Sequence, residues 1–355
     1  AIGFVLLGAG KPIVICTVDW TGLLNEAHIA WRSALAEAAG TTPERVAVQC
    51  VHQHNAPFAC LDAEKLAAKQ GDLPHVVDLD FFSTCLDRGR TAIKDALSKG
   101  RRVTHVARGQ AKVDQVAGNR RVQRDATKKV LAMRGSSCKN ADLRALPEGL
   151  IDPWLKTVTF FEKDAPIAAC HYYACHPMSY YGDGRVSSDF VGLARKQRQK
   201  EAPGCHRLYF TGCAGNVAAG KYNDGSKPMR PVLTKRIHDA MVESEKALKP
   251  EPVGEMAWST ADVMLQPLKE PTPREIAERI GNAKNKVADR IIAAYRLTYH
   301  ERKTPIVLSS LALNDIALLH LPAESFVEYQ LAAQKMAPKK FVATAAYGDG
   351  GPWYI

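Results

Sequence analysis

Short apolar runs alternate with longer amphipathic stretches along most of the chain. The short runs are rich in β-branched residues, which is typical of buried strands, and the longer stretches carry apolar residues at helical spacing. The pattern predicts strands at Phe4–Leu7, Ile13–Val18, Val46–Val51, Thr104–Arg108, Thr157–Phe161, Ile167–Ala174, His206–Phe210, Met256–Leu265, Ile306–Ala312 and Ile316–Leu321, and helices at Leu23–Ala39, Leu79–Ser98, Ser188–Ala202 and Pro231–Leu248. This alternation predicts an α/β fold with a mixed β-sheet core flanked by helices, and in such folds functional groups collect at strand ends.

One longer amphipathic stretch runs from Thr272 to about His300. Thr272 and Glu275 form a capping box around Pro273, and apolar residues then recur at helical spacing. The pattern predicts one long amphipathic helix over 272–300 that packs on the protein body, with docking of a partner helix as the alternative. Apart from the short linker Glu270–Pro273 into that helix, no segment resembles a domain boundary, so residues 1–355 are expected to form a single domain. Both ends fall inside structured segments, so we expect the chain to lack its natural termini.

Composition narrows the class of protein. Of the 355 residues, 46% are hydrophobic and 24% charged, which is typical of a globular protein. No apolar run is long enough for a transmembrane helix, and no signal peptide is visible. The net charge of +11 is dispersed without an aromatic-interleaved stripe, which argues against nucleic-acid binding and leaves a solvated surface, anionic substrates or peripheral contact with a membrane surface. The nine cysteines include no CxxC pair, which argues against a zinc ribbon or redox motif and leaves one or two disulfides possible.

Two histidines one residue apart follow the predicted strand Val46–Val51. Residues i and i+2 of an extended chain point to the same side, so His52 and His54 could aim at one point beyond the strand end. Imidazole is the commonest protein ligand for a catalytic metal, which makes this pair the first candidate site.

Two further strand ends carry metal-ligand chemistry. His176 ends a strand-like run before Pro177, and Glu324 falls at a strand-to-helix junction. Two histidines and a carboxylate form a common catalytic zinc environment. The alternatives are a structural histidine and a carboxylate that is favoured by a helix N-terminus.

Three other residues could support such a site. Arg120 lies in a turn and could stabilise an oxyanion, although a surface role is the alternative. Tyr347 or Tyr354, in a late glycine-rich loop, could add a phenol oxygen, or could simply pack the loop. A second glycine-rich loop follows a strand at residues 211–216 and lacks the lysine of a P-loop.

In this order, the clusters resemble the neutral/alkaline non-lysosomal ceramidase family, in its N-terminal catalytic domain. Six segments correspond to motifs of that family. Val51–Pro57 corresponds to Thr-His-Thr-His-Ser-Gly-Pro, Asn119–Arg120 to Asn-Arg, and His176–Ser179 to His-Pro-Thr-Ser. Gly212–Val217 corresponds to Gly-Ala-Ala-Gly-Asp-Val, Pro322–Glu324 to Pro-Gly-Glu, and Trp353–Ile355 to Gly-Tyr-Val. These short matches span nearly the whole chain.

The resemblance implies a ceramidase-like zinc hydrolase that cleaves an amide (N-acyl) bond of a lipid or small molecule with metal-activated water. It assigns Zn²⁺ to His52, His176, Glu324 and Tyr354, and it places His54 and Arg120 at the substrate carbonyl and the attacking water. His54 is then the candidate for proton transfer. The resemblance also implies export to the periplasm or the medium, while the compartment itself stays open.

The chain departs from the family pattern at two motif positions. Alanine replaces glycine at Ala56, and asparagine replaces aspartate at Asn216. These departures leave three functions open: an amidase with an unassigned substrate, an esterase or other metal-dependent hydrolase of a small polar substrate, and a non-catalytic binding protein on the same fold.

Overall fold

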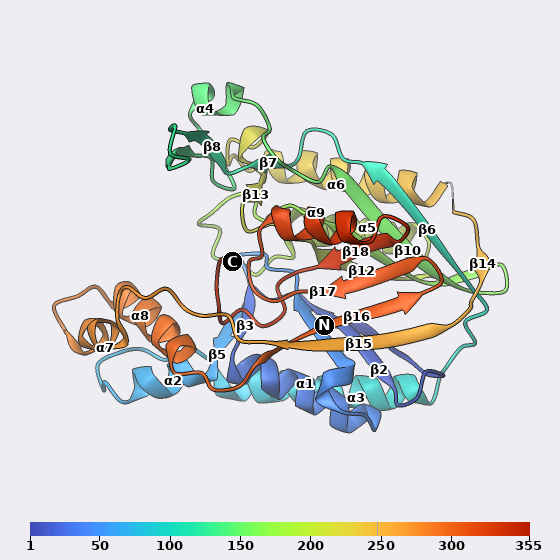
Figure 1. Cartoon of the computed structure of the whole chain (residues 1–355), viewed down its shortest axis with the longest axis horizontal. Helices are drawn as coiled ribbons and strands as arrows, with labels where there is room; N and C mark the ends of the chain where they lie inside the picture. Colours follow the sequence, from blue (N-terminus) through green and yellow to red (C-terminus); the bar gives the residue numbers. More distant parts are fainter. Residues whose placement is uncertain (247) are drawn as a thin grey trace.

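The computed structural model describes residues 1–246 and 248–355, and its layers run helix, sheet, sheet, helix (Figure 1). Helices α1 (Glu26–Ala39) and α3 (Leu79–Leu97) cover one outer face, and α5 (Asp189–Glu201) and α6 (Met229–Lys246) cover the other. An apolar core lies under each helix pair, and a third core lies between the sheets. The predicted α/β class with mixed sheets and flanking helices is confirmed. No helix among the described residues is long and apolar enough to cross a membrane.

Three sheets make up the centre of the molecule. The first contains, in spatial order, β1 (Ile2–Leu6), β2 (Ile13–Val18) and β4 (Val46–Cys50). The second contains β12 (His206–Thr211), β11 (Ala165–Tyr173), β10 (Trp154–Glu162), β6 (His105–Lys112) and β14 (Glu251–Pro252). The third contains β15 (Met256–Val263), β16 (Ile306–Leu313), β17 (Ile316–His320) and β18 (Phe341–Ala345). Each sheet has one parallel pair: β2 with β4, β11 with β12, and β17 with β18. Parallel neighbours end at the same edge, so each of these pairs sends two loops to one side of its sheet.

Smaller elements connect and cover these sheets. They are β3 (Gly22–Leu24) paired with β5 (Phe58–Cys60), β7 (Gly118–Asn119) paired with β13 (Val217–Ala218), the hairpin of β8 (Arg121–Arg124) and β9 (Val130–Met133), and helices α2 (Leu61–Ala68), α4 (Ala141–Ala145) and α9 (Val327–Met336). The helix predicted from residue 23 begins only at Glu26, because the first residues form β3 and Asn25 turns the chain with a φ of 49°. The helix predicted over 231–248 includes residue 247, which lies outside the described residues.

The single helix predicted over 272–300 is wrong, since two helices occupy that stretch. α7 (Pro273–Gly281) begins with the predicted capping box, and α8 (Val287–His300) follows after a turn. Asn282 ends α7, and its side chain accepts a hydrogen bond from the Lys284 backbone N–H. Asparagine side chains compete with the helical backbone in this way, and Gly281 before it weakens the helix further. The two helices pack on each other and on the protein body beside α2 (Figure 1).

Candidate metal centre

The candidate ligands lie on loops that leave neighbouring strand ends. His52 follows β4, His176 follows β11 and Glu324 follows β17. Gln49, the one polar side chain in buried β4, fastens these ends together, because its Nε2 donates to the carbonyls of Leu321, Ala345 and Ala346, each at 3.0 Å. The candidate residues therefore lie beyond strand ends, as the sequence predicts.

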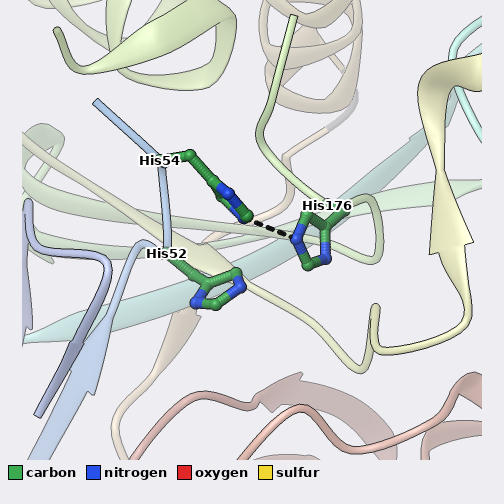
Figure 2. Close-up of side chains that lie close together, drawn as sticks. All are labelled: His52, His54 and His176. Carbon is green, nitrogen blue, oxygen red and sulfur yellow. Dashed lines mark hydrogen bonds between the residues drawn. The ribbon is translucent and has the colours of Figure 1, made fainter. Parts of the chain in front are cut away.

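Three imidazoles converge at this place, as Figure 2 shows. His52, His54 and His176 each offer a ring nitrogen, and these three atoms lie within 4.8 Å of one another. The Nε2 atoms of His54 and His176 are 2.8 Å apart and share a hydrogen bond. His52 and His176 are buried, whereas His54 is partly exposed. His52 and His54 thus converge as predicted, with a third histidine added, but not through extended-strand geometry, since β4 ends at Cys50 and His52 has a φ of 70°.

A backbone carbonyl holds the His52 side chain and fixes a proton on one of its nitrogens. Its Nδ1 lies 2.6 Å from the Thr21 carbonyl oxygen, which can only accept, so Nδ1 carries the proton. In the neutral ring, Nε2 presents a lone pair, and 3.3 Å away lies Oε2 of Glu324. Both atoms are buried and neither has a hydrogen-bond partner among the described residues. Two buried atoms of this kind, a ring nitrogen and a carboxylate oxygen, require a cation or a proton between them.

The backbone around these groups is held in an uncommon conformation. His52, Ala323, Tyr347 and Trp353 all have φ values between 56° and 70°, in the left-handed region that residues other than glycine rarely adopt. Such residues persist where the surroundings fix them, and they cluster at functional sites.

The donor set fits a zinc ion. Oε2 of Glu324 lies 3.3 Å from His52 Nε2 and 3.8 Å from His176 Nδ1, so one carboxylate oxygen borders two ring nitrogens. Two imidazoles and one carboxylate suit zinc, and the contact of His52 with the Thr21 carbonyl fixes the tautomer that a ligand needs.

Burial sets the protonation of these groups. It lowers the pKa of His54 to about 4, helped by the nearby His52, and it lowers the pKa of His176 well below its usual value. Both rings are therefore neutral at neutral pH and can present a lone pair. Burial raises the pKa of the Glu324 carboxyl, but His52 and the Tyr354 hydroxyl lower it by more, so the net shift is downward and the group is a carboxylate.

Two tyrosines and an arginine border the cluster. The buried Tyr347 stacks on the His52 ring at 4.3 Å between centroids, and its hydroxyl lies 3.4 Å from His176 Nδ1. The half-exposed Tyr354 accepts a hydrogen bond from Arg120 Nη1 at 3.1 Å. Burial, together with Glu324, raises the pKa of Tyr354 to about 12, so its phenol is protonated in the absence of a cation. The structure thus brings both candidate tyrosines and Arg120 to the site.

A small apolar pocket opens beside the cluster. It has a volume of about 170 Å³, and its wall combines site residues with Leu24, Phe58 and Trp353. Sequence analysis missed these three residues and also Thr21 and Gln49. Only Gln49 carried a signal, as a polar residue inside a run of buried apolar ones.

The departure at Asn216 has a structural account. Its Oδ1 accepts a hydrogen bond from the Val327 backbone N–H at 2.9 Å, and its Nδ2 donates to Glu328 at 2.7 Å. The side chain therefore holds the first turn of α9, which follows Glu324. An aspartate could accept from Val327 in the same way but could not donate to Glu328.

Comparisons with known proteins connect this geometry to one group of enzymes. No family model matches the sequence, and no curated protein matches it significantly. Among solved structures, the chain is similar to neutral ceramidase from Pseudomonas aeruginosa, with a TM-score of 0.67 and 16% identity over 98% of this chain. It is also similar to a ceramidase structure described as complexed with C2, with a TM-score of 0.63 and 14% identity over 96% of this chain. The chain spans 61% of the length of each of these ceramidase chains. The resemblance inferred from the sequence motifs is therefore confirmed at the level of the fold.

Proposed function

We propose that this chain is a zinc-dependent hydrolase that cleaves an amide (N-acyl) bond. The observation that carries the proposal is the buried pair of His52 Nε2 and Glu324 Oε2, which lie 3.3 Å apart, have no hydrogen-bond partner among the described residues and lie beside His176. A cation bound between them would satisfy both atoms, and the ceramidase fold supports amide hydrolysis as the reaction.

His52, His176 and Glu324 are the proposed ligands, and Tyr354 is the fourth. A catalytic zinc ion supplies a Lewis acid and lowers the pKa of water. The Thr21 carbonyl keeps His52 in the tautomer that binds through Nε2. Tyr347 lies against His52 and close to His176, so it positions both rings.

His54 and Arg120 are the proposed catalytic groups. His54 is the least buried imidazole of the cluster, and its low pKa keeps it neutral and ready to accept a proton from water. The same ring then returns the proton to the leaving amine. Burial lowers the pKa of Arg120, but Tyr354 and Glu324 raise it by more, so the guanidinium keeps its charge beside the site and can stabilise an oxyanion.

Metal content tests the ligand set. The purified chain is expected to hold one zinc per molecule, and His52→Ala and His176→Ala are expected to lose it. His320→Ala is the matched control, because His320 is equally buried but lies in β17 against Ser309, away from the cluster. Full zinc content in His176→Ala would refute the assignment.

Turnover of acyl compounds tests the reaction. A panel of N-acyl and O-acyl compounds separates the proposed amidase from an esterase of the same metal centre, which no observation here favours. Hydrolysis of the amides that disappears on chelation and returns with zinc supports the proposal. A zinc-loaded protein that cleaves no acyl compound contradicts it.

A further inference from the structure

We propose, resting on the amidase function above, that the substrate carries a short acyl group of about six carbons or fewer. The apolar pocket beside the metal centre has a volume of about 170 Å³. A dry apolar protein cavity of roughly 150 Å³ is filled by a molecule the size of benzene. A long-chain acyl group such as palmitoyl exceeds this space.

The pocket runs from the metal centre to an apolar wall. His52, His54 and Glu324 line one part of it, and Leu24, Phe58 and Trp353 line another. These last three belong to the apolar cluster that α2, α7 and α8 complete. The wall therefore has packed protein behind it, and an acyl chain that enters from the metal centre meets a closed end.

Helix α8 fixes that closed end through Tyr295. The Tyr295 ring packs edge-on against Phe58 at 5.1 Å between centroids, and it lies 5.9 Å from the Trp353 ring. Gly22 lets the Phe58 ring lie directly on the β3 backbone, because a Cβ at that position would come within 2.7 Å of the ring. The ring is thus held from two sides and cannot swing away to lengthen the pocket without disturbing α8.

The apolar wall of the pocket favours the acyl portion of the substrate over the amine portion. Outside the metal cluster, the lining side chains carry two polar groups: the Thr21 hydroxyl, which already donates to the Gln53 carbonyl at 2.7 Å, and the Trp353 indole N–H, which has no acceptor among the described residues. The rest of this wall is apolar, so an alkyl chain fits it better than an amine leaving group with several polar substituents. The exposed Tyr181 lies 6.2 Å from the His54 ring and does not line the pocket, so the amine portion faces solvent there.

A chain-length series tests the inference. Amides of one fluorogenic amine with acetyl, butyryl, hexanoyl, decanoyl and palmitoyl groups are compared by kcat/KM. We expect the rate to rise to about hexanoyl and then to fall at least roughly tenfold by decanoyl. Phe58→Ala should remove most of that fall, and Phe58→Trp should move the optimum to shorter chains.

Controls keep the outcomes separate. Phe341→Ala is matched, since Phe341 is also partly buried but lies at the far end of β18, and it should leave the chain-length profile unchanged. Phe58→Leu replaces Phe58→Ala if the alanine variant fails to fold. A wild-type optimum at palmitoyl, or a profile that no Phe58 variant alters, would overturn the inference.

Direct binding distinguishes this inference from the function on which it rests. Calorimetric titration with hexanoate and palmitate reports on the pocket without any turnover. Selective hexanoate binding that Phe58→Trp weakens would support the short pocket even if no amide were cleaved, in which case the proposed function alone fails. Equal or tighter binding of palmitate would overturn the short pocket.

Discussion

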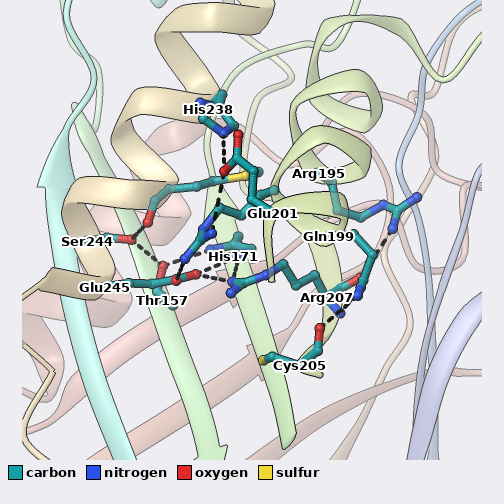
Figure 3. A network of polar contacts seen from close by, with 12 residues as sticks. Thr157, His171, Arg195, Gln199, Glu201, Cys205, Arg207, His238, Ser244 and Glu245 are labelled. Atoms are coloured by element: carbon teal, nitrogen blue, oxygen red, sulfur yellow. Dashed lines mark hydrogen bonds and ion pairs between the residues drawn. The ribbon is translucent and has the colours of Figure 1, made fainter. Parts of the chain in front are cut away.

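Two groups of buried polar residues lie along the same strand, and their histidines differ in what surrounds them. His171 sits in β11 and belongs to a network with Arg207 and Glu245 (Figure 3). Its Nδ1 lies 2.9 Å from the Thr157 hydroxyl, and its Nε2 lies 3.5 Å from both Arg207 Nη1 and Glu245 Oε1. His176, just beyond the end of β11, shares its cluster with two other histidines and a carboxylate.

The difference separates a structural histidine from a candidate ligand. In the His171 network both carboxylate oxygens of Glu245 receive guanidinium donors, from Arg207 and Arg198. In the metal centre, Glu324 Oε2 and His52 Nε2 lie next to each other, and neither has a hydrogen-bond partner among the described residues. Burial alone therefore does not identify a functional histidine, and neither does a nitrogen without a partner, since His320 Nε2 also has none. What distinguishes the metal centre is that such a nitrogen lies beside a carboxylate oxygen that also borders a second imidazole.

The largest effect is expected from His54→Ala, which tests the division of roles within the metal centre. Loss of a general acid–base group lowers kcat/KM by about 10²- to 10⁴-fold. Because His54 is proposed as a proton carrier, zinc content should stay at one per chain, as measured by elemental analysis beside the kinetic assay. Loss of zinc together with activity would show instead that all three imidazoles are ligands.

The positions of the candidate ligands could be predicted from the sequence, but the contacts that distinguish them from His171 could not. The strand ends at His52, His176 and Glu324 were visible because apolar runs stop there. The orientation of the His52 ring depends on the Thr21 carbonyl, a backbone group that no side-chain pattern reports. Strand β18, which carries the chain to Tyr347, was missed because Phe341–Ala345 is short and includes two alanines.

The break between α7 and α8 could not be predicted from the apolar pattern either. The apolar spacing continues through Ala283, so periodicity alone predicted one helix. The turn is decided by a local hydrogen bond of the Asn282 side chain, which competes with the helical backbone. The wall at Phe58 and Trp353 escaped prediction because it joins segments far apart in sequence.

The second-largest effect is expected from Glu245→Ala in the His171 network. The variant leaves the buried Arg207 guanidinium without its carboxylate, and breaking a buried ion pair costs about 3–5 kcal/mol. Urea unfolding measures the loss in free energy of unfolding, while zinc content should not change. Glu243→Ala on the same helix is the control, because its exposed pair with Lys246 contributes less than about 1 kcal/mol. Loss of zinc in Glu245→Ala would link the two regions.

The pH dependence of stability should be smaller, and His171 should be one of its sources. Burial, aided by Arg207, Arg198 and Arg195, lowers its pKa in the folded state well below its usual value. The unfolded chain therefore binds the extra proton, so this contribution is complete above about pH 6.5 and is lost below it by about 1.4 kcal/mol per pH unit. His171→Gln keeps a partner for Thr157 and should flatten the fall between about pH 5 and 6.5. Identical slopes for wild type and variant, measured by urea unfolding, would count against a neutral buried His171.

The smallest effect is expected from Glu324→Gln and has the opposite sign to Glu245→Ala. An amide at position 324 can donate to His52 Nε2, which replaces a repulsive pair of acceptors with a hydrogen bond. In the presence of a chelator, the free energy of unfolding should rise by about 0.5–1.5 kcal/mol, as measured by urea titration. The same variant should lose zinc and activity.

Glu324→Ala separates the removal of the carboxylate from the gain of a hydrogen-bond donor. It removes the carboxylate without adding a donor, so its free energy of unfolding should rise by less. A Glu324→Gln protein less stable than metal-free wild type would mean that the carboxylate is already satisfied, and the contrast with Glu245 would fail. A gain would show that this chain retains a destabilising group where a metal is to bind, as expected when function and stability compete at one site.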